Sequence, residues 1–349
     1  MLPITLDALD LNWLDTALRS RSPAVRLRAI RDRKIILGTA TKILVHVEYE
    51  RPPGVDEPPE RLCIKGGFDE ALRPMTARAY QSEAHFYAHV ARDLGIPLPR
   101  CWYAAASPAQ GQGVVILDDL NAVGARFTDP LQPWSADTVA AALETQARWH
   151  GRTWGATQER YPWYPIGTWV RDVADTLLSE SEWQHFLVDP EAPKLPEALQ
   201  DRERMRRALF AMWRLDDADD QRCLAHSDAH MGNTFVLPDG RVGFLDWQAL
   251  AIAPSMDDVS NIIGGSMTIA SRRANERSLL QHYLDVLAVS GGPRLTFDDA
   301  WLKYRRYHMH GILWPPTPAA MQLPEKTRVM SERHIAAIID HEVLQLLEG

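Results

Sequence analysis

The sequence predicts an α+β fold in which strands come first and helices fill most of the later chain. Short β-rich runs gather between residues 34 and 65 and return at 114–117, whereas helical periodicity dominates after residue 118. The length of 349 residues exceeds one typical domain, so one large domain or two lobes are expected. With 46% hydrophobic and 24% charged residues, the composition is that of a globular protein with a sizeable core.

The first part of the chain predicts a short helix followed by strands. Residues 7–20 are amphipathic and are followed by Pro23. Two β-rich runs, 34–37 and 43–48, are joined by a small-residue loop that contains Gly38. Such a loop either folds over nucleotide phosphates through its backbone N–H groups or is a plain hairpin turn, and one glycine does not decide between them.

A third strand and a long helix follow an exposed, proline-rich connector over residues 50–60. The strand, residues 61–65, ends on Lys65. In the helix predicted over 76–94, Glu83 falls inside an apolar stripe at helical spacing. A carboxylate that faces inward is costly unless it is paired, so we expect an ion pair between Glu83 and Lys65. The alternative is a solvated lysine and a glutamate at the edge of the stripe.

The middle of the chain contains one more strand and a helix-rich segment. An apolar run at 114–117 predicts the strand, and residues 137–150 predict a helix. Residues 157–220 are rich in tryptophan and acidic residues; we expect most of these tryptophans in the core and one or two in the wall of a ligand pocket. The acidic cluster at 216–220 is expected to be a solvated loop rather than a clamp for the substrate. Further helices are predicted near 272–290, 297–311 and 326–347.

The most informative stretch is residues 222–248, which we call the cassette. A short apolar run leads into H-S-D-A-H-M-G-N, and two strands then flank the turn Pro238-Asp239-Gly240. Because a hairpin folds its far end back to its start, Asp246 should return close to Asn233. Asp228, Asn233 and Asp246 would then form an oxygen-only site of the kind that Mg²⁺ prefers.

Two other interpretations of the cassette remain open. Each Asp or Asn alone is a common turn residue. Alternatively, His226, Asp228 and His230 could hold zinc or iron, because imidazole and carboxylate suit transition metals. That set leaves Asn233 and Asp246 unexplained.

The cassette resembles the catalytic loop and metal-binding aspartate of kinases, and most closely the aminoglycoside phosphotransferase and choline kinase-like superfamily. That superfamily usually carries H-G-D-x-H-x-x-N followed by I-D-W or I-D-F; here Ser227 replaces the glycine and the second motif is L-D-W. The resemblance implies that Asp228 is the catalytic residue and that Asn233 and Asp246 hold Mg²⁺. His226 would be structural and His230 accessory.

The resemblance extends beyond the cassette and implies a nucleotide site. Lys65, positioned by Glu83, would contact the α- and β-phosphates of ATP. The segment Leu117-Asp118-Asp119 resembles the hinge, commonly L-x-L-E-D-L, that binds adenine through its backbone; Asp118 stands where Glu is commoner. With Gly38 of the loop, these residues complete the predicted ATP site.

Three further segments resemble the superfamily. W-H-G-R-T-W, ending the helix at 137–150, resembles its L-H-A-x-x-W motif. Asp258 in P-S-M-D-D-V resembles the aspartate that begins a helix and steadies the catalytic loop, with Asp257 as an alternative one position earlier. The segments S-E-A-H-F-Y and R-R-A-N-E-R-S-L-L-Q-H-Y-L-D-V-L resemble the ecdysteroid kinase-like branch.

Taken as a whole, the resemblance implies a bilobal protein-kinase-like fold. A small antiparallel β-sheet lobe, residues 1–117, would bind the nucleotide, and a larger, mainly helical lobe, residues 118–349, would carry the catalytic and substrate-binding groups, with a hinge near 115–121. The implied activity is transfer of the γ-phosphoryl group of Mg-ATP to a hydroxyl of a small molecule, either an apolar alcohol or an aminoglycoside-like compound. The alternatives are a catalytically silent nucleotide-binding pseudokinase and a His/Asp metal-dependent hydrolase.

Charge and composition narrow the partners. A formal charge of −8 argues against nucleic acid or an anionic membrane as the main partner and allows a cationic or neutral substrate. The three cysteines are far apart and lack metal-ligand spacing, which suits reduced thiols in a cytoplasmic protein. The N-terminus lacks the features of a secretory signal, and no apolar run reaches the length of a membrane span. The sequence does not indicate the oligomeric state.

Overall fold

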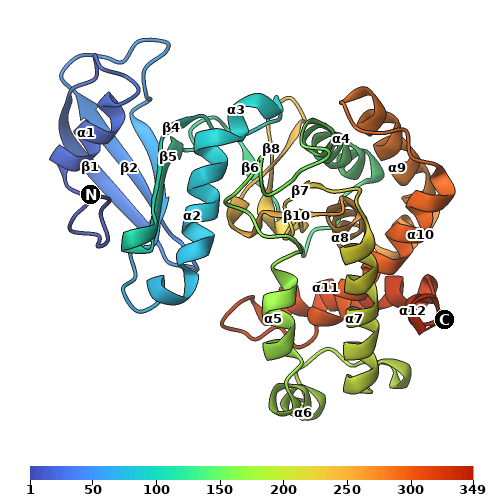
Figure 1. Cartoon of the computed structure of the whole chain (residues 1–349). Coiled ribbons are helices and arrows are strands. Elements are labelled where there is room, and N and C mark those ends of the chain that lie inside the picture. Colours follow the sequence, from blue (N-terminus) through green and yellow to red (C-terminus); the bar gives the residue numbers. More distant parts are fainter. Residues whose placement is uncertain (349) are drawn as a thin grey trace. The chain divides into compact units, whose positions relative to one another are not determined.

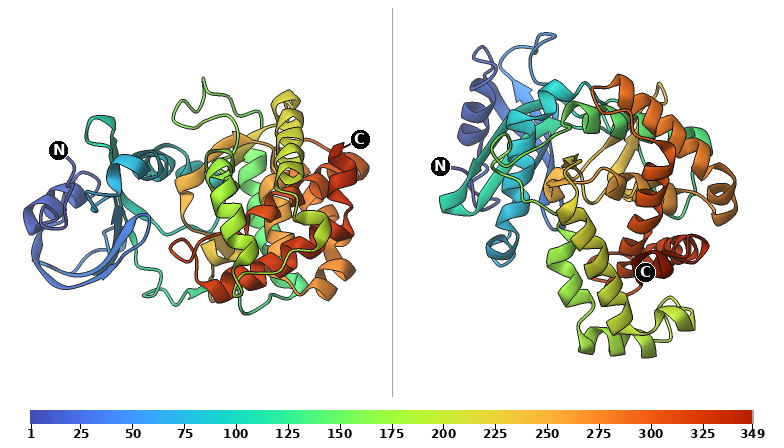
Figure 2. Two further views of the ribbon diagram at one scale, coloured as in Figure 1. Left: turned by 90° about the horizontal axis from the view of Figure 1, so that it is seen from below. Right: turned by 45° about the vertical axis from the view of Figure 1, so that its right-hand side comes forward.

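The computed structural model describes residues 1–348, and the chain divides into two compact units. Unit 1 contains residues 1–126 and the short segment 246–249, and unit 2 contains the rest of the described chain. Segment 246–249 thus comes from the middle of the sequence of unit 2 but packs in unit 1. The predicted lobe boundary between residues 117 and 118 stays a prediction. Figures 1 and 2 show the elements of each unit in three views.

Unit 1 is built on a five-stranded antiparallel sheet. In spatial order its strands are β1 (Leu27–Ile36), β2 (Thr41–Tyr49), β3 (Arg61–Gly66), β5 (Gln112–Asp118) and β4 (Cys101–Ser107). Four of these strands were predicted; β4 was not. Its C-W-Y-A-A-A-S sequence contains three alanines, which have little intrinsic strand preference, so its pairing with β5 decides its conformation.

The two faces of this sheet carry different helices. Helix α1 (Leu11–Arg19) packs on one face, where Leu14 and Leu18 join the core formed by inward-facing residues of the sheet. Helix α2 (Arg73–His89), followed by the short α3 (Ala91–Leu94), packs on the other.

Gly113 lets α2 approach strand β5 closely. A Cβ at Gly113 would lie 2.1 Å from the backbone oxygen of Tyr80, so only glycine allows this approach. Helix α2 therefore packs closely enough on the sheet for its buried residues, including Glu83, to contact the strands.

Unit 2 is mainly helical, with two small β-structures. Its helices are α4 (Ala136–Arg152), α5 (Val170–Leu177), α6 (Glu180–Val188), α7 (Arg202–Ala218), α8 (Met256–Ser266), α9 (Ile269–Val289), α10 (Phe297–Tyr307), α11 (Pro324–Asp340) and α12 (Val343–Glu348). Strand β7 (Cys223–Ala225) pairs with β10 (Ala251–Ala253), and β8 (Thr234–Val236) pairs with β9 (Val242–Phe244). A two-residue strand, β6 (Arg126–Phe127), lies where the chain passes from one unit to the other. The α+β class predicted from the sequence is confirmed.

Two expectations about helical segments need correction. The helix predicted over 326–347 is interrupted after Asp340, where Glu342 has a φ of 51°, a left-handed conformation that a helix cannot contain. The acidic cluster at 216–220 is not simply a solvated loop. Asp216 lies in the last turn of α7, is buried, and accepts a hydrogen bond of 2.5 Å from the hydroxyl of Tyr307.

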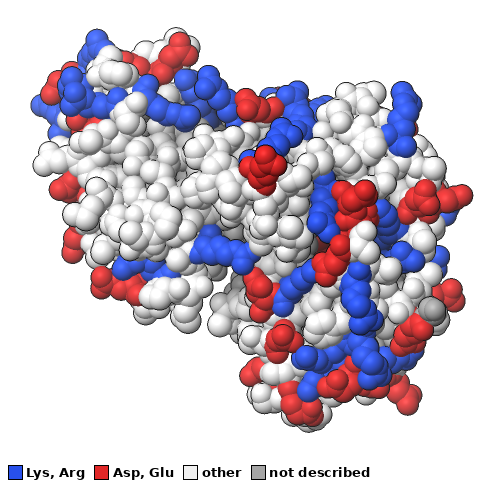
Figure 3. Space-filling model, in the orientation of Figure 1, with Lys and Arg blue, Asp and Glu red and all other residues white. Residues whose placement is uncertain are grey.

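The surface carries both signs of charge. On the face drawn in Figure 3, basic and acidic side chains lie mixed rather than separated into fields of one sign. Among residues 1–348, no helix is long and apolar enough to cross a membrane.

Candidate active site

The loop of the cassette that contains Asp228 is held by one buried carboxylate, that of Asp258. Asp258, in the first turn of α8, accepts hydrogen bonds from the backbone N–H groups of His226 (2.7 Å) and Ser227 (2.9 Å). To point two successive N–H groups at one carboxylate, the chain turns sharply, and Ser227 takes a left-handed φ of 65°. That conformation favours glycine, so the serine in this motif stands in a strained position.

A second buried residue fixes Asp258 in turn. The Nε2 atom of His150, near the end of α4, lies 3.0 Å from Oδ2 of Asp258, and its Nδ1 atom lies 2.9 Å from the hydroxyl of Tyr283. Burial lowers the pKa of His150, against the opposing effect of Asp258. His150 of the W-H-G-R-T-W motif therefore supports the loop that contains Asp228, a role that the sequence alone did not reveal.

The histidines of the loop are engaged with backbone groups. His226 places Nε2 2.7 Å from the carbonyl oxygen of Leu245 and accepts the N–H of Asp228 at Nδ1, at 3.3 Å. His230 accepts the N–H of Gly232 at Nδ1, at 3.0 Å. Because both nitrogens of His226 are used in this way, it is not a free metal ligand, and the geometry argues against the zinc or iron interpretation.

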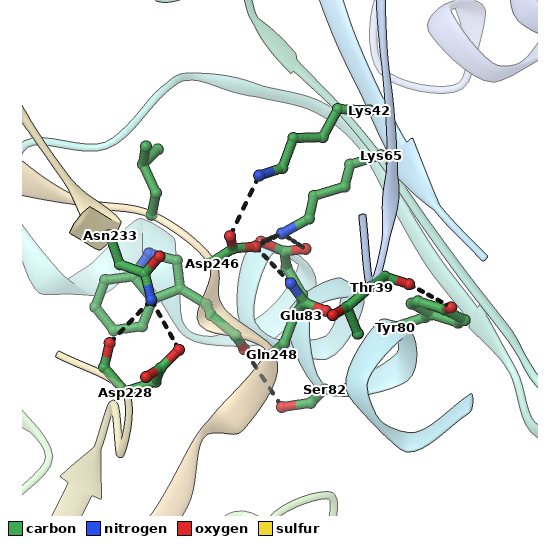
Figure 4. A network of polar contacts seen from close by, with 12 residues as sticks. Thr39, Lys42, Lys65, Tyr80, Ser82, Glu83, Asp228, Asn233, Asp246 and Gln248 are labelled. Atoms are coloured by element: carbon green, nitrogen blue, oxygen red, sulfur yellow. Dashed lines mark hydrogen bonds and ion pairs between the residues drawn. The ribbon is translucent and has the colours of Figure 1, made fainter. Parts of the chain in front are cut away.

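Asp228 and Asn233 face each other across the loop (Figure 4). The amide nitrogen of Asn233 donates to the backbone oxygen of Asp228 (3.0 Å) and to its Oδ2 (2.8 Å). The side chain of Asp228 is 35% exposed, so its carboxylate can meet a ligand. Since the NH₂ end of Asn233 is spent on Asp228, its Oδ1 is the end available to a cation.

The predicted hairpin returns the chain to Asn233. Gly240 takes a φ of 87° in the turn between β8 and β9. At the far end, the N–H of Leu245 donates to the carbonyl oxygen of Asn233 at 2.8 Å. Asp246 is the next residue in the chain, so covalent connection alone keeps its backbone near that of Asn233.

In unit 1, Asp246 is the centre of a charged cluster (Figure 4). Its Oδ1 contacts the ammonium group of Lys65, and its Oδ2 lies 3.3 Å from that of Lys42. Lys65 also forms the predicted ion pair with Glu83, at 2.7 Å, and both of these side chains are buried. Burial opposes the charged forms, but the paired charges prevail at two of the groups: Lys65 and Lys42 hold the pKa of Asp246 far below its ordinary value, and Asp246 and Glu83 raise that of Lys65.

Helix α2 anchors the segment that carries Asp246. Trp247, which is fully buried, stacks on Phe86 with ring centroids 4.1 Å apart. The hydroxyl of Ser82 lies 3.4 Å from the backbone oxygen of Trp247. Asp246 itself has a φ of 62°, so this second cassette turn is also left-handed at a residue other than glycine.

The remaining residues of the predicted ATP site lie at two places in unit 1. Gly38 lies between β1 and β2 with an ordinary φ, and a Cβ there would meet its nearest neighbour at 3.5 Å, so glycine is not required at this position. Leu117 is buried at the end of β5. The N–H groups of Asp118 and Asp119 already donate to backbone oxygens, at 3.0 and 3.4 Å.

Two residues of the Asp246 cluster were not predicted from the sequence. Lys42 follows the first residue of β2, directly opposite Lys65 in the β2–β3 register. Gln248 donates to Oδ1 of Asp246. The apolar residues at alternate positions of β2, beginning with Ile43, could have indicated that Lys42 faces away from the core. They could not have indicated that Lys42 contacts Asp246.

Among residues 1–348, one group of His, Cys, Asp or Glu side chains has the spacing of a metal site, and it lies outside the cassette: Glu276, His308 and His341. It already holds a cation. The guanidinium group of Arg272 lies 2.6 Å from Glu276 and 3.3 Å from His341. This buried positive charge opposes a metal ion, so we regard the group as a structural ion-pair network.

Comparisons with known proteins identify the family and the fold of the chain. A family model described as "Phosphotransferase enzyme family" matches residues 71–296. No curated protein matches the chain. Among solved structures, spectinomycin phosphotransferase APH(9)-Ia, in complex with ADP and spectinomycin, is similar with a TM-score of 0.53 at 14% identity and covers 98% of each chain.

Two further solved structures have lower TM-scores. The macrolide 2'-phosphotransferase MphH from Brachybacterium faecium has a TM-score of 0.47 at 14% identity and covers 94% of this chain and 97% of its own. The choline kinase LicA from Streptococcus pneumoniae has a TM-score of 0.48 at 12% identity and covers 95% of this chain and 99% of its own.

Proposed function

The chain belongs to the phosphotransferase enzyme family, which confirms the predicted enzyme class, and we propose that it transfers the γ-phosphoryl group of Mg-ATP to a hydroxyl of a small molecule. One observation carries this proposal. The two parts of the cassette present a half-exposed aspartate held by an asparagine, and a second aspartate surrounded by lysines. This is the set of groups that phosphoryl transfer requires: one to orient a hydroxyl, and others to hold a metal-bound triphosphate.

Asp228 is proposed as the residue that receives the acceptor. Its carboxylate would accept a hydrogen bond from the substrate hydroxyl and take its proton as the phosphoryl group is transferred. The bond from Asn233 keeps the side chain of Asp228 in one orientation. Because the transition state of phosphoryl transfer is loose, positioning contributes more than strong basicity.

Asn233 and Asp246 are proposed to hold Mg²⁺, which would neutralise charge on the triphosphate. The donor set fits the ion: Asp246 offers a carboxylate kept ionised by its lysine partners, and Asn233 offers an amide oxygen. Lys65, held by Glu83, would bind the non-transferred phosphates. Adenine would lie at the end of β5; since the N–H groups of Asp118 and Asp119 are already bonded, the next backbone donor is that of Leu120.

The acceptor is proposed to meet an aromatic wall. The indole N–H of Trp169 donates to the carbonyl oxygen of Ser227 at 2.9 Å. The ring of Trp314 packs edge-to-face with that of His230, with ring centroids 5.4 Å apart. Because Ser227 and His230 flank Asp228 in the sequence, both indoles lie beside the proposed catalytic loop. Aromatic walls suit an apolar alcohol, whereas the net charge of −8 suits a cationic, aminoglycoside-like acceptor. A screen of ATP consumption over hydroxylated metabolites and antibiotics would choose between them.

The decisive experiment separates binding from transfer. Asp228→Asn should abolish phosphoryl transfer while Mg-ATP binding, measured by calorimetry, stays near that of the unmodified protein. Asp246→Asn should instead weaken Mg-ATP binding. Asp239→Asn, an exposed position in the turn of the same hairpin, is the matched control and should change neither. Transfer that survives both Asp228→Asn and Asp246→Asn would refute the proposed roles.

A further inference from the structure

We propose that Lys42 is a second phosphate-binding residue, which works beside Lys65 and provides by its side chain the positive charge that the β1–β2 loop does not provide by its backbone. The inference rests on the proposed function, because it assumes a nucleotide with several phosphates in this site. It adds a residue that neither the motifs nor the family match assigns.

The first support is the register of the sheet. Lys42 on β2 pairs directly with Lys65 on β3, and side chains of directly paired residues lie on the same face. Residues on the opposite face of β2, such as Ile43, belong to the core of unit 1. In Figure 4 the two lysines extend from neighbouring strands toward the same carboxylate, that of Asp246.

The second support is the difference between the two lysines. Lys65 is 5% exposed and is paired with both Glu83 and Asp246. Lys42 is 40% exposed and, among residues 1–348, forms its one ion pair with Asp246. A divalent cation bound to Asp246 would compete with both ammonium groups for its negative charge and would repel them. With a cation at Asp246, Lys65 would keep Glu83 as its partner, whereas Lys42 would need another anion, and a phosphate oxygen is a strong one for a lysine.

The third support is the loop itself. A phosphate-binding loop normally offers several backbone N–H groups, for which glycines make room. The loop at residues 37–40 contains one glycine, and it does not take a left-handed conformation. Its Thr39 carbonyl oxygen accepts a hydrogen bond of 2.6 Å from the hydroxyl of Tyr80, which ties the loop to α2. A side-chain cation two residues after Ala40 supplies the missing positive charge.

The variants that test this role are Lys42→Met, which removes the charge, and Lys42→Arg, which keeps it. Arg31→Met is the matched control: it removes one positive charge from the same sheet, but at an exposed position paired with Glu48. Calorimetry would give the dissociation constants of adenosine, AMP, ADP and ATP, the last two with Mg²⁺. Thermal unfolding of each variant would show that it is folded.

We expect Lys42→Met to weaken Mg-ATP binding about tenfold, the effect of losing one partly exposed charged hydrogen bond. The loss of affinity in Lys42→Met should become smaller from ATP to ADP to AMP and should be absent for adenosine. Lys42→Arg should bind Mg-ATP with most of the affinity of the unmodified protein. High salt should reduce the difference in Mg-ATP affinity between the unmodified protein and Lys42→Met, because the contact between Lys42 and phosphate would be partly solvated. Equal binding of Mg-ATP by Lys42→Met, or an equal loss for adenosine, would overturn the inference. Failure of the unmodified protein to bind any of these nucleotides would instead overturn the proposed function.

Discussion

Replacement of Ser227 by glycine should stabilise the protein, although Ser227 precedes the proposed catalytic residue. Ser227 has a φ of 65°, and in the described structure its buried hydroxyl has no hydrogen-bond partner. The left-handed backbone costs a residue other than glycine about 1 kcal/mol or more. The buried, unsatisfied hydroxyl costs roughly another 1 kcal/mol.

The gain from Ser227→Gly is smaller than the sum of these two costs. Glycine loses more backbone entropy on folding than serine does, which reduces the stabilisation by about 0.5–1 kcal/mol. The net expectation is therefore a stabilisation of about 1 kcal/mol, or roughly 2–4 °C in the melting temperature of a unit of this size. Phosphoryl transfer should be retained, because the contacts of this position with Asp258 and Trp169 use only its backbone.

Chemical denaturation and calorimetric melting would measure the effect, and Ser227→Ala separates its two causes. Alanine removes the hydroxyl but keeps the Cβ in the left-handed conformation, so it should recover only the part due to the unsatisfied hydroxyl. A Ser227→Gly protein that is less stable than the unmodified one would refute the strain argument. A stable but inactive Ser227→Gly protein would show that the hydroxyl has a partner in the working enzyme.

Three further expectations follow from buried positions. Asp258→Ala should destabilise unit 2 by about 3–5 kcal/mol and abolish transfer, since it leaves two buried loop N–H groups and a histidine without their acceptor, and denaturation curves would detect this. Burial, the largest influence, raises the pKa of Asp216 from 3.8 to about 6, so the folded protein binds this proton more tightly than the unfolded chain does. The contribution of Asp216 to the free energy of unfolding should therefore fall as the pH rises from about 4 to about 6, and Asp216→Asn, compared with Asp217→Asn at the exposed next position, should remove that contribution. Gly113→Ala should cost at least about 2 kcal/mol in the same assay and raise the KM for ATP, because its Cβ would overlap the backbone of α2, whereas Gly38→Ala should be tolerated.

The sequence predicts the site best where its argument is local. Hydrophobic periodicity placed Glu83 inside a buried helix face and Lys65 at the end of a strand, and the cost of burying an unpaired charge then predicted their ion pair. The hairpin at Pro238-Asp239-Gly240 follows from turn chemistry, and it returns Leu245 to Asn233. In each case, the prediction depends on the properties of a few residues that are close together in the sequence.

Contacts between segments far apart in the chain could not be predicted from the sequence. Lys42 was missed because nothing in β2 indicates that a residue two hundred positions later will lie against its side chain. His150 was noted only as part of a motif, because its role depends on where α8 brings Asp258. Strand β4 depends on its partner β5 more than on its own alanine-rich sequence.

The amino-acid sequence by itself determined the α+β class, most helices and strands, and the residues that we propose for phosphoryl transfer. The tertiary structure alone decided that segment 246–249 packs in unit 1 against α2, and that Ser227 and Asp246 take left-handed conformations. The physical reason is the range of the interactions. Periodicity and turn preference act within a few residues, whereas the stacking of Trp247 on Phe86 depends on how whole elements pack.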